Sequence, residues 1–175
     1  MSATRLVTPD DVPALTALVR DNREFLAPWE PARGEDYFTD EGQHAAVQSA
    51  LARYRQGSIL PCVILDESGQ VAGRITLTEI VRGPFQSCHV GYWLSAAAGG
   101  RGLATTAVRE ICGIAFARLA LHRIEAGTLL HNVRSQRVLE RNGFTRIGVA
   151  PAYLSIAGRW QDHALYQLIN PSRQP

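Results

Sequence analysis

A cluster of glycines separates two hydrophobic periodicities in the middle of the chain, and this switch limits the folds that the sequence can adopt. Residues 90–94 are mostly apolar and aromatic, which favours a buried strand. After the glycines, apolar residues recur at every fourth position, as on one face of a helix: Leu103, Ala107, Ile111, Ala115 and Leu119. The pattern therefore predicts a strand that turns directly into a helix.

The turn between that strand and that helix is suited to an anion. Main-chain NH groups in the first turn of a helix lack intrahelical acceptors, and the helix dipole adds positive charge there. Gly100 and Gly102 let an anion approach the main chain, and Arg101 adds a charged donor. The stretch has neither the Lys-Ser/Thr of a Walker A loop nor the third glycine of a dinucleotide fingerprint. Taken alone, it also fits a glycine-rich junction that binds nothing.

Two motifs, in order, resemble those of the GNAT superfamily, the GCN5-related N-acetyltransferases that take acetyl groups from acetyl-CoA. Residues 99–104 resemble its pyrophosphate loop Gln/Arg-x-x-Gly-x-Gly/Ala, with Gly99 at the first position. Residues 131–144 resemble its second motif, Asn-x-x-Ser-x-x-(apolar)-(apolar)-x-x-x-Gly-Phe. Residues 22–31, 79–88 and 153–163 look like the RimJ/RimL group, whose RimJ-type members acetylate the N-terminal alanine of a ribosomal protein.

Length and composition favour one globular domain over residues 1–175, with 46% hydrophobic residues. No secretory signal and no apolar run of roughly eighteen residues is evident, so we expect a cytoplasmic protein without a membrane span. A net charge of +2 is too small to predict direct nucleic-acid binding. The three cysteines lack metal-ligand spacing, so we expect buried thiols and no metal site.

The order of periodicities predicts the architecture. Strands are expected at 5–8, 59–65, 71–80, 87–94, 124–130, 144–149, 152–156 and 161–169. Helices are expected from Pro9 to about Arg23, from Thr39 or Asp40 to Gln56, from Leu103 onward, and from Asn132 to Asn142; residues 21–31 are expected to be an ordered loop. This is an α/β (α+β) class sandwich that matches the GNAT fold, a mixed, mostly antiparallel sheet of about seven strands flanked by about four helices.

The resemblance implies a set of cofactor contacts. The main chain of one segment would hold the pyrophosphate of acetyl-CoA: Gly100, Arg101, Gly102, Leu103, Ala104 and Thr105. The backbone of Tyr92, Trp93 and Leu94 would pair with the pantetheine arm and bind the acetyl oxygen. Asn132 would bond the same arm, and it also suits a helix N-cap.

Candidates for proton transfer are fewer. Ser135 shares a helix face with Val138 and Leu139, and it matches the general acid proposed for the RimL branch; a core serine bonded to a carbonyl is the alternative. The superfamily often has a glutamate base at the position that Gly127 occupies in this chain. Glu125 would lie on the same strand face two residues earlier and is one candidate for the base, and Glu79 is the other. An N-terminal amine, with a pKa near 7.8, needs less help than lysine, near 10.4, to lose its proton. The shortage of obvious bases therefore favours an α-amine acceptor.

Three large aromatic residues are candidates for the acceptor pocket. Phe25 and Trp29 would line it or form a satellite core cluster, and Trp160 is the third candidate. The sequence thus predicts an N-acetyltransferase that transfers acetyl directly, in a ternary complex, to the N-terminal alanine or serine of a ribosomal or other protein. A small amine (antibiotic, amino acid or polyamine) is an alternative acceptor, and a non-catalytic CoA-binding, ribosome-associated module is an alternative role. The acyl-chain preference and the oligomeric state stay open, with a homodimer as one option.

Overall fold

The computed structural model describes residues 2–173 and contains one seven-stranded sheet in the order β1-β2-β3-β4-β5-β7-β6. Neighbouring strands are antiparallel except β4 and β5, which are parallel. The strands are β1 (Thr4–Leu6), β2 (Leu60–Leu65), β3 (Val71–Val81), β4 (Ser87–Leu94), β5 (Arg123–Leu129), β6 (Thr145–Ile156) and β7 (Arg159–Ile169). The sheet confirms the predicted mixed, mostly antiparallel GNAT architecture.

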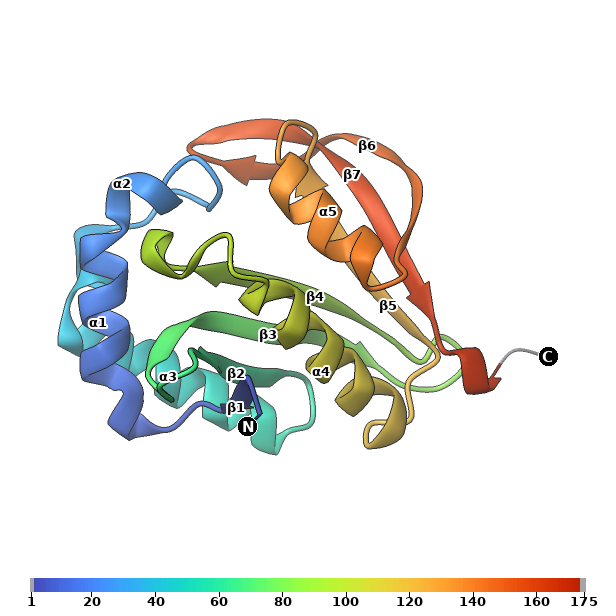
Figure 1. Cartoon of the computed structure of the whole chain (residues 1–175), viewed down its shortest axis with the longest axis horizontal. Coiled ribbons are helices and arrows are strands. Elements are labelled where there is room, and N and C mark those ends of the chain that lie inside the picture. The colour runs from blue at the N-terminus through green and yellow to red at the C-terminus, as the bar shows by residue number, and fades with distance from the viewer. Residues whose placement is uncertain (1, 174–175) are drawn as a thin grey trace.

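Helices cover both faces of the sheet (Figure 1). The α-helices are α1 (Val12–Asp21), α2 (Arg23–Leu26), α3 (Asp40–Arg55), α4 (Leu103–Ala117) and α5 (Val133–Arg141). Short 3₁₀ helices span Pro9–Asp11, Glu35–Phe38, Ala96–Ala98 and Pro171–Arg173. None of the helices within residues 2–173 has the length and apolar character that a membrane span requires.

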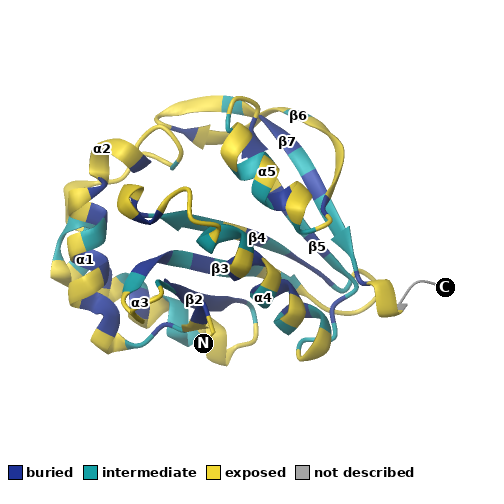
Figure 2. Ribbon diagram, in the orientation of Figure 1, coloured by how far each residue is buried: buried dark blue, intermediate teal, exposed yellow. Residues whose placement is uncertain are grey.

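Alternating side chains of β2 build a core on each side of the sheet. Cys62 and Ile64 join the larger cluster with Ile111 of α4 and Leu139 of α5. Val63 points the other way and joins the smaller cluster, which α1 and α3 cover. Side chains therefore alternate between an α4/α5 face and an α1/α3 face, and Figure 2 shows the central strands as the most buried part of the fold.

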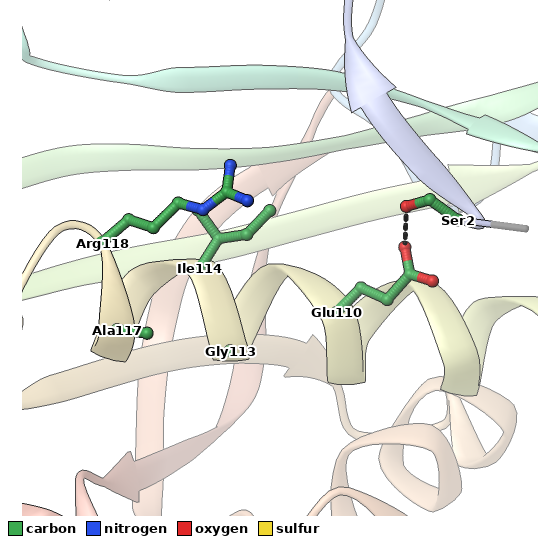
Figure 3. A pocket seen from close by; sticks show the side chains of 6 residues that line it. All are labelled: Ser2, Glu110, Gly113, Ile114, Ala117 and Arg118. Atoms are coloured by element: carbon green, nitrogen blue, oxygen red, sulfur yellow. Dashed lines mark hydrogen bonds between the residues drawn. The ribbon is translucent and has the colours of Figure 1, made fainter.

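The N-terminal strand is tied to α4 by one carboxylate. Glu110 accepts hydrogen bonds from the Ser2 hydroxyl at 2.9 Å, the Ala3 main-chain NH at 2.8 Å and the Thr4 hydroxyl at 2.9 Å. Figure 3 shows Glu110 beside Ser2 at a shallow hollow along this helix. Burial alone would raise the pKa of Glu110, but these bonds outweigh it and lower the pKa.

Four details differ from the sequence predictions. The segment 21–31 is not wholly a loop, because it contains α2. The two strands expected at 144–149 and 152–156 are one strand, β6, whose register shifts between Ala150 and Leu154. The helical spacing of apolar residues in 40–56 predicts that Tyr54 lies on the inner face of α3 with Val47 and Leu51, but Tyr54 is 40% exposed. Helix α4 ends at Ala117, so Leu119 lies beyond it.

Candidate active site

The sheet is split between its two parallel strands. Strands β4 and β5 pair only at Ser87–Arg123, Cys88–Ile124 and His89–Glu125. Beyond His89 the strands diverge toward α2, as Figure 1 shows. The facing edges of residues 90–94 and 126–129 therefore leave main-chain groups without a strand partner, available to a ligand.

A cleft of about 200 Å³ lies in this split. Its walls come from both strands, from the segment after α2, and from α5, β6 and β7: Leu26, Trp29, Glu30, Val90, Gly91, Tyr92, Trp93, Ala126, Gly127, Thr128, Leu129, Asn132, Ser135, Leu139, Leu154, Ile156 and His163. The hydroxyl of Thr128 is buried and has no hydrogen-bond partner within residues 2–173. An unpaired buried hydroxyl in the wall of a cleft marks a place where a polar ligand atom would be stabilised.

The start of α4 has the properties expected of an anion site. Gly100 and Gly102 both have φ of +80°, and nothing lies within 4 Å of where a Cβ would be. Within residues 2–173, the main-chain NH groups of residues 100–105 have no hydrogen-bond acceptor; the first bonded one is Thr106, to Gly102 at 3.1 Å. Arg101 donates to the Ala97 carbonyl at 2.7 Å, so in this structure its guanidinium braces the loop.

Two asparagines that the sequence analysis did not assign hold this loop. Asn22, buried after α1, accepts from the Ala96 NH at 2.8 Å and donates to the Leu18 carbonyl at 2.9 Å. Asn142, after α5, donates to the Thr105 carbonyl at 3.2 Å. The amides at the start of α4 are thus fixed from both sides before any ligand arrives.

Ser135 lines the cleft and meets a second hydroxyl there. Its Oγ lies 2.9 Å from the Tyr92 hydroxyl. Burial raises the pKa of Tyr92 to about 12, although the bond to Ser135 opposes the shift. Both groups are therefore protonated at neutral pH and could deliver a proton to an anion in the cleft. The sequence motifs predicted a role only for the backbone of Tyr92, not for its hydroxyl.

Asn132 caps α5, as expected, by accepting from the Ser135 NH at 3.1 Å. Within the described chain its amide nitrogen has no bonded partner, and the residue lines the cleft. It can therefore cap the helix and still donate to a ligand.

Of the two carboxylates predicted as bases, neither lines the cleft. Glu79 is exposed, and its Oε2 lies 3.1 Å from His89 Nδ1 without hydrogen-bond alignment. Glu125 Oε2 lies 3.4 Å from His89 Nε2, and its Oε1 lies 3.7 Å from Arg123. The two acids thus flank His89 at the closed end of the split.

Of the three aromatic candidates, one lines the cleft. Trp29 lies there, with its ring 5.4 Å from that of His131. Phe25 and Trp160 are exposed, Trp160 at 69%, and lie outside the cleft. Beside Trp29, the structure adds Glu30, which no motif indicated; the only signal was its place in a segment expected to wall the acceptor pocket.

These features fit acetyl-CoA. Free amides beside two open glycines suit its pyrophosphate. The unpaired edges of β4 and β5 suit the amides of its pantetheine arm. When bound, the cofactor supplies the activated acetyl group, and the residues of the cleft would hold and orient it.

Comparisons with known proteins agree with this geometry. Residues 4–145 match the model of the acetyltransferase (GNAT) domain family. A probable N-acetyltransferase, YjcK of Bacillus subtilis, is 37% identical over 88% of this chain and 86% of its own length. The ribosomal protein uS5-alanine N-acetyltransferase of Escherichia coli is 34% identical over 98% of this chain and 89% of its own length.

Among solved structures, Mycobacterium smegmatis RimJ in complex with CoA-disulfide superposes with a TM-score of 0.92 at 30% identity, covering 98% of this chain and 83% of that one. The family match spans most of the chain and includes the split, the start of α4 and Ser135. The chain therefore belongs to the GNAT acetyltransferase family, and it is an N-acetyltransferase that uses acetyl-CoA.

Proposed function

We propose that this enzyme acetylates the N-terminal α-amine of a protein, with alanine or serine at the first position and a ribosomal protein as the leading substrate. The observation that carries the proposal is the 34% identity, over nearly the whole chain, to an enzyme named for alanine acetylation of ribosomal protein uS5. The cleft is lined by the segment after α2 and by β6 as well as by the split strands, so an acceptor that reaches the split would contact these elements.

The amine attacks the thioester carbonyl directly while both substrates are bound. The main chain at the start of α4, from Gly100 to Thr105, holds the pyrophosphate. The edge of Tyr92, Trp93 and Leu94 holds the pantetheine arm with Asn132, and Ser135 protonates the departing thiolate. Its 2.9 Å contact with the Tyr92 hydroxyl supports this role, because the second hydroxyl can restore the proton. Glu79 and Glu125 stay predictions as bases.

One domain, residues 1–175, would carry the whole activity in the cytoplasm. Phe25 and Trp160 would contact the acceptor protein outside the cleft, since both are exposed. We propose no direct contact with nucleic acid, and a homodimer stays one option.

A panel of acceptors tests the proposal. Peptides that begin with the first residues of bacterial ribosomal proteins, with alanine, serine or a blocked N-terminus, are compared with aminoglycosides, free amino acids and polyamines. CoA release is followed spectroscopically, and mass spectrometry locates the acetyl group. We expect transfer to the free α-amine of alanine or serine peptides. Preferential transfer to a small amine would overturn the acceptor assignment, and CoA binding without turnover on any acceptor would favour a non-catalytic module.

A further inference from the structure

Among the described residues that line the cleft, Glu30 is the one with a carboxylate. Its side chain is only 16% exposed. The cation paired with it is Arg33, whose Nε lies 3.8 Å from Oε2, beyond hydrogen-bonding distance. Glu30 is therefore a largely buried carboxylate in the wall of the cleft, with no hydrogen bond of normal length to Arg33.

Glu30 lies on the opposite side of the sheet from Ser135. Val63, Arg74 and Trp93 are paired across β2, β3 and β4, so their side chains share one face. Val63 packs in the cluster under α1 and α3, which identifies that face. Glu30 and Arg74 interact electrostatically, so Glu30 belongs to this side as well.

Tyr92, the next residue to Trp93, points to the other face, where its hydroxyl meets Ser135. The split thus has a proton donor at its α4/α5 side and a carboxylate at its α1/α3 side. A cofactor anchored at the start of α4 enters from the first side. An amine that enters from the second side would pass Glu30 before it reaches the thioester.

We infer that Glu30 is the catalytic base of this enzyme: it binds the acceptor's amine and takes its proton as the amide forms. This inference rests on the proposed function. In the step, the amine nitrogen bonds to the carbonyl carbon, the carbon–sulfur bond breaks, the extra proton on nitrogen passes to the Glu30 carboxylate, and the thiolate takes a proton from the Ser135 hydroxyl. The Tyr92 hydroxyl then returns a proton to Ser135, and exchange with solvent restores Tyr92 and Glu30.

The surroundings of Glu30 suit a base. Burial raises its pKa, while Arg33 and Arg74 pull the pKa down, and the net shift is upward. Tyr37, on the 3₁₀ helix beside it, has its own pKa raised by burial and by the Glu30 charge. The other ionisable side chains that line the cleft are Tyr92 of β4 and His163 of β7, and the ring of His131 lies 5.4 Å from that of Trp29 at a tilt of 37°. A carboxylate that binds a proton more tightly than an exposed one is a stronger base, as the step requires.

The place of Glu30 is fixed by the main chain. Its carbonyl accepts from the NH of Ala157 at 2.9 Å, so the β6–β7 turn holds the segment over the split. Glu30→Gln keeps this bond and the side-chain shape. It also removes a largely buried charge, so the variant should not be less stable than the parent.

The test compares Glu30→Gln with Glu24→Gln, an exposed acid on α2 in the same segment, and with Glu79→Gln and Glu125→Gln. We measure kcat at saturating alanine peptide from pH 5.5 to 9, the CoA dissociation constant by calorimetry, and Tm. For Glu30→Gln we expect about a 100-fold loss of kcat, loss of the acidic limb of the pH profile, and a CoA dissociation constant within twofold of the parent. Glu24→Gln should match the parent in all three.

The assignment of Glu30 as the base would be overturned if kcat for Glu30→Gln is within threefold of the parent value. It would also be overturned if the acidic limb of the pH profile is lost in Glu79→Gln or Glu125→Gln instead. Either result leaves the proposed function intact. If the parent protein itself transfers acetyl to no α-amine, the proposed function fails first and the assignment fails with it.

Discussion

Replacing Asn22 should weaken coenzyme A binding although this residue does not line the cleft. The residue joins the end of α1 to the loop before α4 through its bonds to Ala96 and Leu18. In Asn22→Ala the Ala96 NH loses this partner, and the Leu18 carbonyl keeps only its bond from the main-chain NH of residue 22. The loop that presents the amides of residues 100–105 then loses its side-chain bond to the end of α1.

The magnitude follows from the two bonds. Each is worth about 1–1.5 kcal/mol, so Asn22→Ala should lower the free energy of unfolding by about 2–3 kcal/mol. Asn22→Asp keeps an acceptor for the Ala96 NH at 2.8 Å and loses only the donor to Leu18, so it should cost about half as much. Ordering the loosened loop on binding should cost Asn22→Ala about 1 kcal/mol, or roughly a fivefold weaker CoA dissociation constant. Asn22→Asp should bind CoA nearly as well as the parent.

Urea denaturation gives the stabilities and calorimetry gives the CoA affinities. Asn170→Ala is the matched control, because Asn170 is also buried, donates to the Leu121 carbonyl at 3.0 Å and accepts from the Ser172 NH at 3.0 Å. Unlike Asn22, it lies after β7 and forms no hydrogen bond with the residues before α4. It should lose similar stability without losing CoA affinity. If Asn22→Ala binds CoA as tightly as the parent, or if Asn170→Ala weakens binding equally, the argument that Asn22 positions the loop is refuted.

Three further predictions concern the cleft, the sheet and the N-terminal strand. Ser135→Ala and Tyr92→Phe should each lower kcat, Ser135→Ala by about 100-fold. The double variant should have a kcat no lower than that of the more impaired single variant. Additive losses in steady-state kinetics would show that the two hydroxyls do not act together. Gly73→Ala should cost more than about 2 kcal/mol in urea denaturation, because its Cβ would lie 2.1 Å from a main-chain oxygen, whereas Gly113→Ala on α4, with nothing within 4 Å, should gain up to about 1 kcal/mol. Folding lowers the pKa of Glu110, so the stability that its carboxylate contributes is complete above the unfolded pKa, near 4.5, and is lost as the pH falls through the folded pKa. Glu110→Gln should flatten the dependence of unfolding free energy on pH in this acidic range. An unchanged dependence would contradict a stabilising role for the Glu110 carboxylate.

Local patterns in the sequence were enough to predict most elements and the start of α4. The period change at Gly100 and Gly102 predicted the strand, the turn and the helix, and these glycines have the left-handed backbone that such a turn needs. Asn132 predicted a cap and forms one. Each of these features depends on residues that are close in the chain, which is why pattern reasoning reached them.

The rest depends on contacts between distant segments. Glu30 meets β4 and β5 only because the turn at Ala157 bonds to it, over a hundred residues later in the chain. Nothing in the sequence near Asn22 shows that it will bond to Ala96. Two strands were predicted where the structure has one, β6, whose register against β7 shifts between Ala150 and Leu154, with Ala152 at φ of +46°. Such a shift depends on the pairing with β7 and leaves no local signal in the sequence.

The short seam between β4 and β5 has a consequence for how this protein responds to its cofactor. Three residue pairs join the N-terminal half of the sheet to the C-terminal half, and past them the strands have no mutual hydrogen bonds. Coenzyme A lying in that gap would take the place of the missing ladder and connect the halves. The cofactor would therefore stabilise the contact between the two halves of the sheet as well as react, so the stability of that contact would rise with the cofactor concentration.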